Sequence, residues 1–439
     1  MSGHGHSRFH VAPGGALTGE LRVPGDKSIS HRAVMLGGVA EGDTRITGLL
    51  EGEDVLATVA AFRALGVRIS GPEGGALLIS GGGFDGLQPP PGPLDLGNSG
   101  TSMRLLAGLF SGVAFDTELA GDASLSRRPM RRVTEPLAAM GASIETGAEG
   151  TAPLRIHGGV RLHGIDYQLP VPSAQVKSAL LLAGLRAKGQ TCVTEPAPTR
   201  DHTERMLAAF GCPVERRGNR VCVTGGVQLR GCGVDIPADI SSAAFFLVGA
   251  TLAEGSDLLL RHVGWNPTRT GVVEILRLMG ADIEALNGRD VGGEPVVDLR
   301  VRSAPLRGID IPEALVPLAI DEFPALFIAA ACARGETRLT GAAELRVKES
   351  DRIAVMADVL EVLGAEAEPR ADGIRIVGGD GFVGGRVSSH GDHRVAMSAA
   401  VAALRARDAI VIDDCGPVAT SFPGFVEMAA EAGLRVKAQ

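Results

Sequence analysis

The sequence predicts an α/β protein built as two similar domains, each containing three copies of one repeated unit. Three observations support this prediction: a length of 439 residues, six recurring polar or glycine-containing helix starts, and a glycine that closes the second helix of the copies. Single domains usually hold about 100–200 residues, so a chain of this length is expected to contain at least two.

Each copy is expected to begin with a small-residue apolar helix, followed by a short strand, a second amphipathic helix and a closing strand. The helix starts are at 24–32, 97–104, 172–178, 238–244, 320–325 and 391–397. They are spaced by roughly 65–80 residues, longer than the ~20–50 residues of common solenoid repeats. This spacing suits a complete unit with its own sheet. An ordinary doubly wound sheet is the alternative, and six similar helix stops argue against it.

The helix stops are glycines because the residue after a helix often needs a positive φ, which glycine adopts without strain. These glycines are Gly66, Gly141, Gly211, Gly280, Gly364 and Gly433. The first three copies predict one domain over residues 25–238. The last three predict a second domain over residues 239–439, joined by residues 1–24 through an N-terminal strand. Hinges are expected near residue 24 and at residues 235–239.

Composition excludes several classes of protein. The net charge of −8 argues against a general nucleic-acid or membrane surface, so neither partner is expected. The six cysteines form no C-x-x-C motif and no zinc-like pairing with histidine, so we expect no metal and a reducing, cytoplasmic compartment. The polar segment Met1–His10 lacks the apolar core of a signal peptide. No stretch approaches the ~18 apolar residues of a membrane span.

Basic side chains recur at the predicted helix starts, where free backbone N–H groups already favour anions. They are Lys27, Arg32, Arg104, Arg127, Arg128, Arg131, Arg132, Lys177, Arg200, Arg269, Arg346, Lys348, Arg352 and Arg394. Few acids accompany them, chiefly Asp321, Glu322, Glu349 and Asp351. A single Arg or Lys is more often a solvated surface charge. Their recurrence at one structural position predicts a cleft that binds two anionic molecules and transfers protons.

Several short motifs carry a resemblance to a known family. They are 25–32 (GDKSISHR), 96–101 (LGNSGT), 128–130 (RPM), 173–175 (SAQ), 320–322 (IDE), 346–352 (RVKESDR) and 392–394 (DHR). In this order, over nearly the whole chain, they resemble the signatures of the EPSP synthases, members of the enolpyruvyl transferase family.

This resemblance implies two inside-out α/β barrel domains, each of three βαβαββ repeats, that close on their substrates. It implies transfer of the carboxyvinyl group of phosphoenolpyruvate to the 5-hydroxyl of shikimate-3-phosphate, with release of phosphate, one step before chorismate. It also implies that no metal or organic cofactor takes part. A cytoplasmic monomer is expected, with glyphosate as an inhibitor.

The resemblance also assigns residues to each substrate. Those implied to bind shikimate-3-phosphate are Lys27, Ser28, Arg32, Ser173, Ala174, Gln175, Arg200, Asp321 and Lys348. Those implied to bind phosphoenolpyruvate are Lys27, Asn98, Gly100, Thr101, Arg128, Gln175, Arg352 and Arg394. Ser28 and Ser173 also suit helix N-caps, and a cap and an anion use the same helix end.

The catalytic residues are expected to be Asp321, Glu349 and Lys27. Asp321 would accept the hydroxyl proton, and either Glu349 or Lys27 would protonate the methylene carbon of phosphoenolpyruvate. A structural i,i+3 pair with Arg352 is the alternative role for Glu349. His393 either shuttles protons or orients Arg394.

Three positions depart from or qualify the family pattern. Thr420 stands where some members carry a phosphate-binding Lys, and Ala174 stands where many carry Ser. Gly100 is the residue that glyphosate-insensitive members can replace with Ala, so its presence predicts competition between glyphosate and phosphoenolpyruvate.

Three other functions are alternatives to this one. UDP-N-acetylglucosamine 1-carboxyvinyltransferases share the fold, but their reactive first-domain Cys is missing because no Cys precedes Cys192. A non-catalytic phosphosugar-binding protein would not need Asp321 or Glu349. A P-loop kinase is excluded because the G-x-x-x-x-G-K-[ST] spacing does not occur.

Overall fold

Residues 8–439 are described by a computed structural model, and residues 1–7, within the polar N-terminal segment, lie outside the described part. The chain divides into two compact units. Unit 1 contains the chain up to Pro24 together with Pro237–Asp290 and Pro295–Gln439, and unit 2 contains Gly25–Ile236 and Val291–Glu294. Within residues 8–439, no helix is long and apolar enough to cross a membrane.

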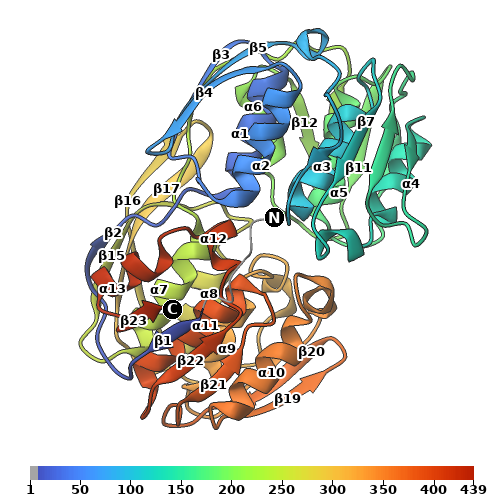
Figure 1. Cartoon of the computed structure of the whole chain (residues 1–439). Helices are drawn as coiled ribbons and strands as arrows, with labels where there is room; N and C mark the ends of the chain where they lie inside the picture. Colours follow the sequence, from blue (N-terminus) through green and yellow to red (C-terminus); the bar gives the residue numbers. More distant parts are fainter. Residues whose placement is uncertain (1–7) are drawn as a thin grey trace. The chain divides into compact units, whose positions relative to one another are not determined.

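Unit 2 is built from three copies of one pattern, each with a four-stranded sheet and two helices (Figure 1). The strand orders of its sheets are β14 (Gly233–Asp235), β3 (Glu41–Thr47), β5 (Ala76–Gly82), β4 (Arg68–Glu73); β6 (Leu94–Asp95), β7 (Thr117–Ala120), β9 (Leu154–His157), β8 (Ser143–Glu145); and β10 (Asp166–Gln168), β11 (Gln190–Thr194), β13 (Arg220–Thr224), β12 (Val214–Arg217). In each sheet the first pair is parallel and the other two pairs are antiparallel.

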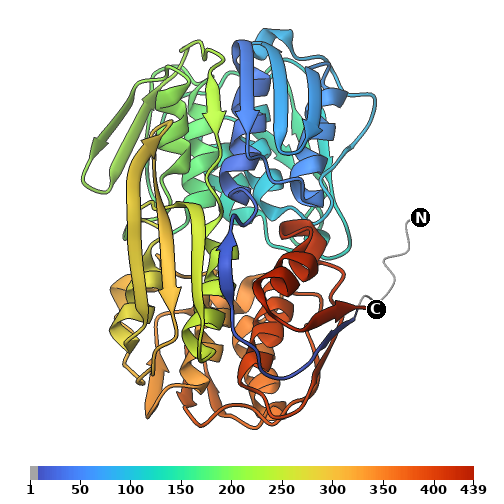
Figure 2. The same cartoon turned by 90° about the vertical axis from the view of Figure 1, so that its left-hand side faces the viewer.

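Unit 1 repeats this pattern with small variations. Its sheets are β16 (Asp282–Val291), β17 (Glu294–Arg302), β15 (Asp257–Gly264), β2 (Thr18–Leu21); β18 (Glu336–Leu339), β20 (Gly373–Val377), β19 (Glu366–Arg370); and β21 (Gly385–Ser388), β22 (Ile410–Asp413), β1 (Phe9–Val11), β23 (Val436–Ala438). Figure 2 shows the long β16–β17 hairpin in yellow and the blue strand β2 of the same sheet. The N-terminal strands β1 and β2 therefore pair with strands from the C-terminal half, as the sequence predicts.

The helices fall into two classes. The first helix of each copy is almost wholly buried; these helices are α1 (Lys27–Val39), α3 (Gly100–Phe110), α5 (Ala174–Gly184), α7 (Ile240–Leu252), α9 (Phe323–Ala331) and α11 (His393–Ala402). The second helices are amphipathic: α2 (Glu53–Ala64), α4 (Arg131–Ala139), α6 (His202–Ala209), α8 (Gly271–Met279), α10 (Arg352–Val362) and α13 (Phe425–Ala432). A short helix, α12 (Val418–Ser421), precedes α13. Each unit packs its apolar side chains into one core.

Glycine ends the second helices as predicted. The six closing glycines, Gly66, Gly141, Gly211, Gly280, Gly364 and Gly433, all have φ between 82° and 118°. A side chain at such a φ would be strained, so this prediction of the repeat pattern is confirmed.

Small residues also let the buried helices approach their neighbours closely. A Cβ placed on Gly108 in α3 would lie 2.1 Å from the carbonyl oxygen of Ala179 in α5, so only glycine permits this contact. The scarcity of aromatic residues, 3% of the chain, agrees with such tight helix packing.

Two of the six cysteines are paired, which the sequence does not predict. Cys192 on β11 and Cys222 on β13 are directly opposed in the antiparallel register and form a disulfide. Their separation of 30 residues along the chain gave no sign of this pairing. Among the residues described, Cys212, Cys232, Cys332 and Cys415 are free thiols.

Candidate active site

The six predicted anion-binding segments all form the starts of buried helices. The residues that immediately precede the six helices are Asp26, Ser99, Ser173, Asp239, Glu322 and Asp392. Five of these side chains accept a hydrogen bond from a backbone N–H of the first turn, and Glu322 does not. Five of the six helices therefore have a side-chain N-cap. The cap satisfies one backbone N–H group, and the other N–H groups of the first turn remain available to an anion.

The predicted site residues of unit 1 lie in one cluster around Arg352. The side chain of Arg352 is 1% exposed, and its Nε lies 2.8 Å from Asp392 Oδ2. Its Nη2 lies 2.7 Å from Glu349 Oε2, and its Nη1 lies 3.3 Å from Asp321 Oδ1. Burial lowers the pKa of Arg352, but these three carboxylates outweigh burial and raise it above its usual value. Arg352 therefore remains a cation that holds the acids together.

Asp321 is the point where this cluster meets two further basic residues. Its Oδ1 lies 3.4 Å from Lys348 Nζ, and its side chain is 13% exposed. Arg394 Nη1 donates a hydrogen bond to the Asp321 carbonyl oxygen at 3.0 Å. Because Lys348 and Arg352 both face the carboxylate, it is oriented while still reachable from outside the core.

A second buried group supports Arg394. Glu322, 2% exposed, accepts a hydrogen bond from Ser241 Oγ on α7, and its Oε1 lies 3.4 Å from Arg269 Nη2. The same oxygen lies 3.8 Å from Arg394 Nη1. Arg394 is thus held between the backbone of Asp321 and the side chain of Glu322.

In unit 2, side chains from the starts of α3 and α5 are linked by direct hydrogen bonds. Gln175 Oε1 accepts a hydrogen bond from Arg104 Nη1 at 2.6 Å, and Gln175 Nε2 donates to Thr101 Oγ1 at 3.1 Å. Arg128, in the loop after the 3₁₀ turn η2 (Leu125–Arg127), donates to Asn98 Oδ1. Arg104 is one of the basic residues at the predicted helix starts, but the sequence does not identify it as a site residue. Its position one turn after Gly100, on the same helix face, is the signal that could have identified it.

Gly100 lies between two of these guanidinium groups. A Cβ on Gly100 would be 2.9 Å from Arg128 Nη1 and 3.2 Å from Arg104 Nη1. Its φ is not in the left-handed region, so a side chain here would meet limited space rather than backbone strain. The starts of α3 and α5 and the loop after η2 therefore form one continuous set of contacts, made by Asn98, Gly100, Thr101, Arg104, Arg128 and Gln175.

Lys27 and Ser28 occupy the first turn of α1. The Nζ of Lys27 forms an ion pair with Asp54 Oδ2 on α2, and its side chain is 23% exposed. The N-cap of this helix is Asp26, which accepts from Ile29 N at 2.8 Å, so the capping role considered for Ser28 is wrong. Ser173 does cap α5, with Val176 N as donor at 3.4 Å, and Ala174 is the first residue of that helix.

Arg32 is the most enclosed of the predicted ligands, at 3% exposure. Its Nε donates to Thr203 Oγ1 at 2.6 Å, Nη1 to the Ser28 carbonyl oxygen at 2.9 Å and Nη2 to Ser178 Oγ at 2.9 Å. Burial lowers its pKa to about 10, with the nearby Arg200 adding to that effect. Arg32 therefore fixes α1 against α5 and α6, and Arg200 lies close enough to affect its charge.

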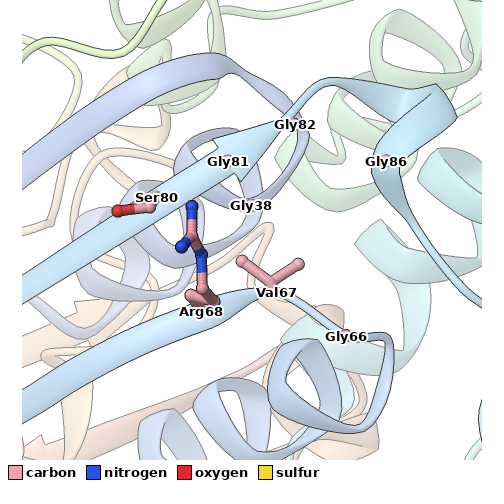
Figure 3. Close-up of a pocket in the computed structure, with 8 residues that line it drawn as sticks. All are labelled: Gly38, Gly66, Val67, Arg68, Ser80, Gly81, Gly82 and Gly86. Atoms are coloured by element: carbon pink, nitrogen blue, oxygen red, sulfur yellow. The ribbon is translucent and has the colours of Figure 1, made fainter.

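A cavity of about 190 Å³ lies elsewhere in unit 2 (Figure 3). It is lined by Gly38, Gly66, Val67, Arg68, Ser80, Gly81, Gly82 and Gly86, none of which is a predicted site residue. It offers one guanidinium and no general base, whereas the helix starts bring acids and bases together. Within residues 8–439, no three His, Cys, Asp or Glu side chains are grouped so as to hold a metal ion.

Comparison with known proteins shows consistent similarities. The model of the family described as EPSP synthase (3-phosphoshikimate 1-carboxyvinyltransferase) matches residues 11–428. A 3-phosphoshikimate 1-carboxyvinyltransferase of Alkalilimnicola ehrlichii is 72% identical over 97% of this chain and 96% of its own length. The enzyme of the same name from Halorhodospira halophila is 72% identical over 98% of this chain and 97% of its own.

A solved structure of EPSP synthase from Acinetobacter baumannii superposes with a TM-score of 0.90 at 56% identity, covering 99% of this chain and all of that one. This likeness extends the similarity from sequence to fold. The fold class predicted from the repeats is confirmed by it.

Proposed function

Because the chain belongs to the EPSP synthase family, we propose that the residues gathered at its helix starts carry out that family's reaction. The chain is a transferase of aromatic amino acid biosynthesis. It moves the carboxyvinyl group of phosphoenolpyruvate to the 5-hydroxyl of shikimate-3-phosphate and releases phosphate.

The proposed substrate contacts follow the chemistry of each group. Shikimate-3-phosphate is bound by Lys27, Ser28, Arg32, Ser173, Ala174, Gln175, Arg200, Asp321 and Lys348. Phosphoenolpyruvate is bound by Lys27, Asn98, Gly100, Thr101, Arg128, Gln175, Arg352 and Arg394. The guanidinium groups supply paired donors for carboxylate and phosphate oxygens. Arg32 also fixes the first turn of α1, because its donors contact Thr203, Ser178 and the Ser28 carbonyl oxygen.

The observation that carries the mechanism is the placement of the Asp321 carboxylate between Lys348 and Arg352. Two adjacent cations favour the ionised, proton-accepting form of a carboxylate. Asp321 takes the proton of the 5-hydroxyl while that oxygen forms a bond to C2 of phosphoenolpyruvate. Glu349 or Lys27 gives a proton to the methylene carbon, which becomes a methyl group.

The product of this addition is a tetrahedral ketal phosphate. Glu349 or another base then removes one methyl proton, the double bond forms again, and the C–O bond to phosphate breaks. The basic residues stabilise the charge that develops on the departing phosphate. Glu349 contacts Arg352 at 2.7 Å, so both roles considered for it, an ion-pair partner and a proton carrier, remain compatible with its position.

The remaining parts of the proposal concern assembly and inhibition. The two units act as two domains, with hinges at their chain connections near residue 24 and at 235–239. The protein works as a monomer in the cytoplasm, the compartment in which the membrane retains phosphorylated metabolites such as its substrates. Glyphosate, which carries a phosphonate and a carboxylate, competes with phosphoenolpyruvate.

The test is phosphate release by the purified full-length chain. With shikimate-3-phosphate and phosphoenolpyruvate together, one phosphate should be released for each shikimate-3-phosphate consumed, and omission of either substrate should stop release. Replacing the acceptor with UDP-N-acetylglucosamine should give none. Release with that acceptor, and none with shikimate-3-phosphate, would overturn the proposal.

A further inference from the structure

A buried hydrogen-bond chain joins the starts of α1 and α3. Its members are His31, Thr58, Ser99 and Ser102, whose exposures are 0%, 0%, 2% and 0%. His31 Nδ1 lies 2.9 Å from Thr58 Oγ1 and 3.1 Å from Ser102 Oγ, and its Nε2 lies 3.4 Å from Ser99 Oγ. The three hydroxyl groups also contact one another, at 2.7 Å and 2.8 Å.

One end of this chain determines how α3 begins. Ser99 is the N-cap of α3, and its Oγ accepts a hydrogen bond from Ser102 N at 3.1 Å. Ser99 stands between Asn98 and Gly100, two residues assigned above to phosphoenolpyruvate. The contact with His31 therefore restrains the segment from Asn98 to Thr101 from its buried side.

The other end reaches Lys27. Thr58 Oγ1 donates to the carbonyl oxygen of Asp54 at 3.3 Å, and the side chain of Asp54 pairs with Lys27. His31 also follows Lys27 by one turn of α1. The imidazole thus connects a proposed catalytic lysine with the proposed phosphoenolpyruvate segment without being exposed to substrate.

The charge state of His31 fits this role. Burial, together with Lys27 and Arg32, holds the pKa of His31 well below its usual value, against the smaller opposing effect of Asp26. A neutral imidazole offers one donor and one acceptor, and hydroxyl groups can match either. Fully paired buried polar groups hold their neighbours in a fixed arrangement, whereas an unpaired one is costly.

We propose that His31 is a positioning residue for phosphoenolpyruvate, which acts by fixing Ser99 and thus the Asn98–Thr101 segment. This inference rests on the proposed function, because it assigns that segment to phosphoenolpyruvate. His31 takes no part in proton transfer, since it lies beneath the site and contacts only Thr58, Ser99 and Ser102 among the hydrogen bonds described.

The test compares His31→Leu, which removes both ring nitrogens, with His31→Asn, which keeps a donor and an acceptor. In His31→Leu, the KM for phosphoenolpyruvate should rise about tenfold, while the KM for shikimate-3-phosphate changes less than about twofold. His31→Asn should recover most of the loss. Thr44→Val is the matched control, because Thr44 is equally buried in the same repeat and its Oγ1 has no hydrogen-bond partner among residues 8–439.

Equal rises in both KM values, or an unchanged KM for phosphoenolpyruvate, would overturn the inference. If His31→Leu does not fold, Ser102→Ala replaces it under the same criteria, because Ser102 contacts both His31 and Ser99.

Amide hydrogen exchange of the free protein adds a readout independent of turnover. Exchange at 98–101 should accelerate about tenfold in His31→Leu and not in Thr44→Val. Failure of the unsubstituted chain to release phosphate would instead contradict the proposed function.

Discussion

Arg352 and Asp392 form a buried ion pair, with Arg352 Nε 2.8 Å from Asp392 Oδ2 and side-chain exposures of 1% and 0%. Asp392 also accepts hydrogen bonds from Ser350 Oγ at 3.0 Å and from the backbone N–H of Arg394 at 2.9 Å. The Asp392 carboxylate therefore holds Arg352 and Arg394, two proposed phosphoenolpyruvate ligands. It also holds Ser350, which follows Glu349 in the chain. Burial raises the pKa of Asp392, but Arg352 and His393 outweigh it and keep the pKa below its usual value.

We expect Asp392→Ala to lower both stability and activity. Removing one partner of a buried pair leaves the other charge uncompensated, which costs about 3–5 kcal/mol of unfolding free energy. Because Arg352 and Arg394 lose their anchor, kcat/KM for phosphoenolpyruvate should fall by about a hundredfold or more. Urea unfolding and steady-state kinetics measure these effects. Asp358→Ala, on the exposed side of α10, is the control and should change neither quantity appreciably.

Asp321→Ala should separate binding from turnover. If Asp321 is the base, its loss should reduce kcat by about 10²–10⁴-fold. Calorimetric binding of shikimate-3-phosphate should weaken much less, because the other proposed ligands remain. Lys348→Met removes a cation 3.4 Å from the same carboxylate. Because Lys348 is also a proposed ligand of shikimate-3-phosphate, this variant should lower kcat and raise the KM for shikimate-3-phosphate. A kcat for Asp321→Ala within tenfold of the unsubstituted value would contradict the role of base.

Lys177 should be essential for the stability of unit 2. It is fully buried, and its Nζ lies 2.9 Å from Glu195 Oε2 and 2.8 Å from Glu204 Oε1. Lys177→Met would leave two buried carboxylates without their cation, at a cost of about 3–5 kcal/mol. Lys188→Met, at an exposed position in the same repeat, should cost little. Urea unfolding monitored by circular dichroism distinguishes the two, and equal stability of the two variants would refute this account.

The sequence predicted the repeats well because their signals are local. The six helix starts and the six closing glycines depend on capping and on positive φ, which short segments encode. The cluster of Asp321, Lys348, Glu349, Arg352 and Arg394 was assigned by resemblance, and the structure brings its members together.

Contacts between distant segments were not visible in the sequence. The disulfide of Cys192 and Cys222 depends on strand register, and the pairing of Lys27 with Asp54 depends on how α1 packs on α2. His31 belongs to the GDKSISHR motif, but its role is visible only in the packed structure, where its ring reaches Ser99 and Thr58.

Gly100→Ala should reduce sensitivity to glyphosate more than it reduces catalysis. The added methyl group would lie 2.9 Å from Arg128 Nη1 and 3.2 Å from Arg104 Nη1. Both atoms are the ends of flexible side chains, so they can move and the fold should lose less than about 1 kcal/mol. The space available to a bound anion would shrink, however, and glyphosate is longer than phosphoenolpyruvate.

We therefore expect the KM for phosphoenolpyruvate to rise a few-fold and the inhibition constant of glyphosate to rise by about tenfold or more in Gly100→Ala. Inhibition assays at several phosphoenolpyruvate concentrations measure both values and show whether the inhibition is competitive. Gly92→Ala is the matched control, because a Cβ there meets no atom within 4 Å and its φ is not positive. If glyphosate at millimolar concentration leaves the unsubstituted protein fully active, the assignment of Gly100 to the glyphosate site is wrong, whereas the assignment of Asp321 as base is unaffected.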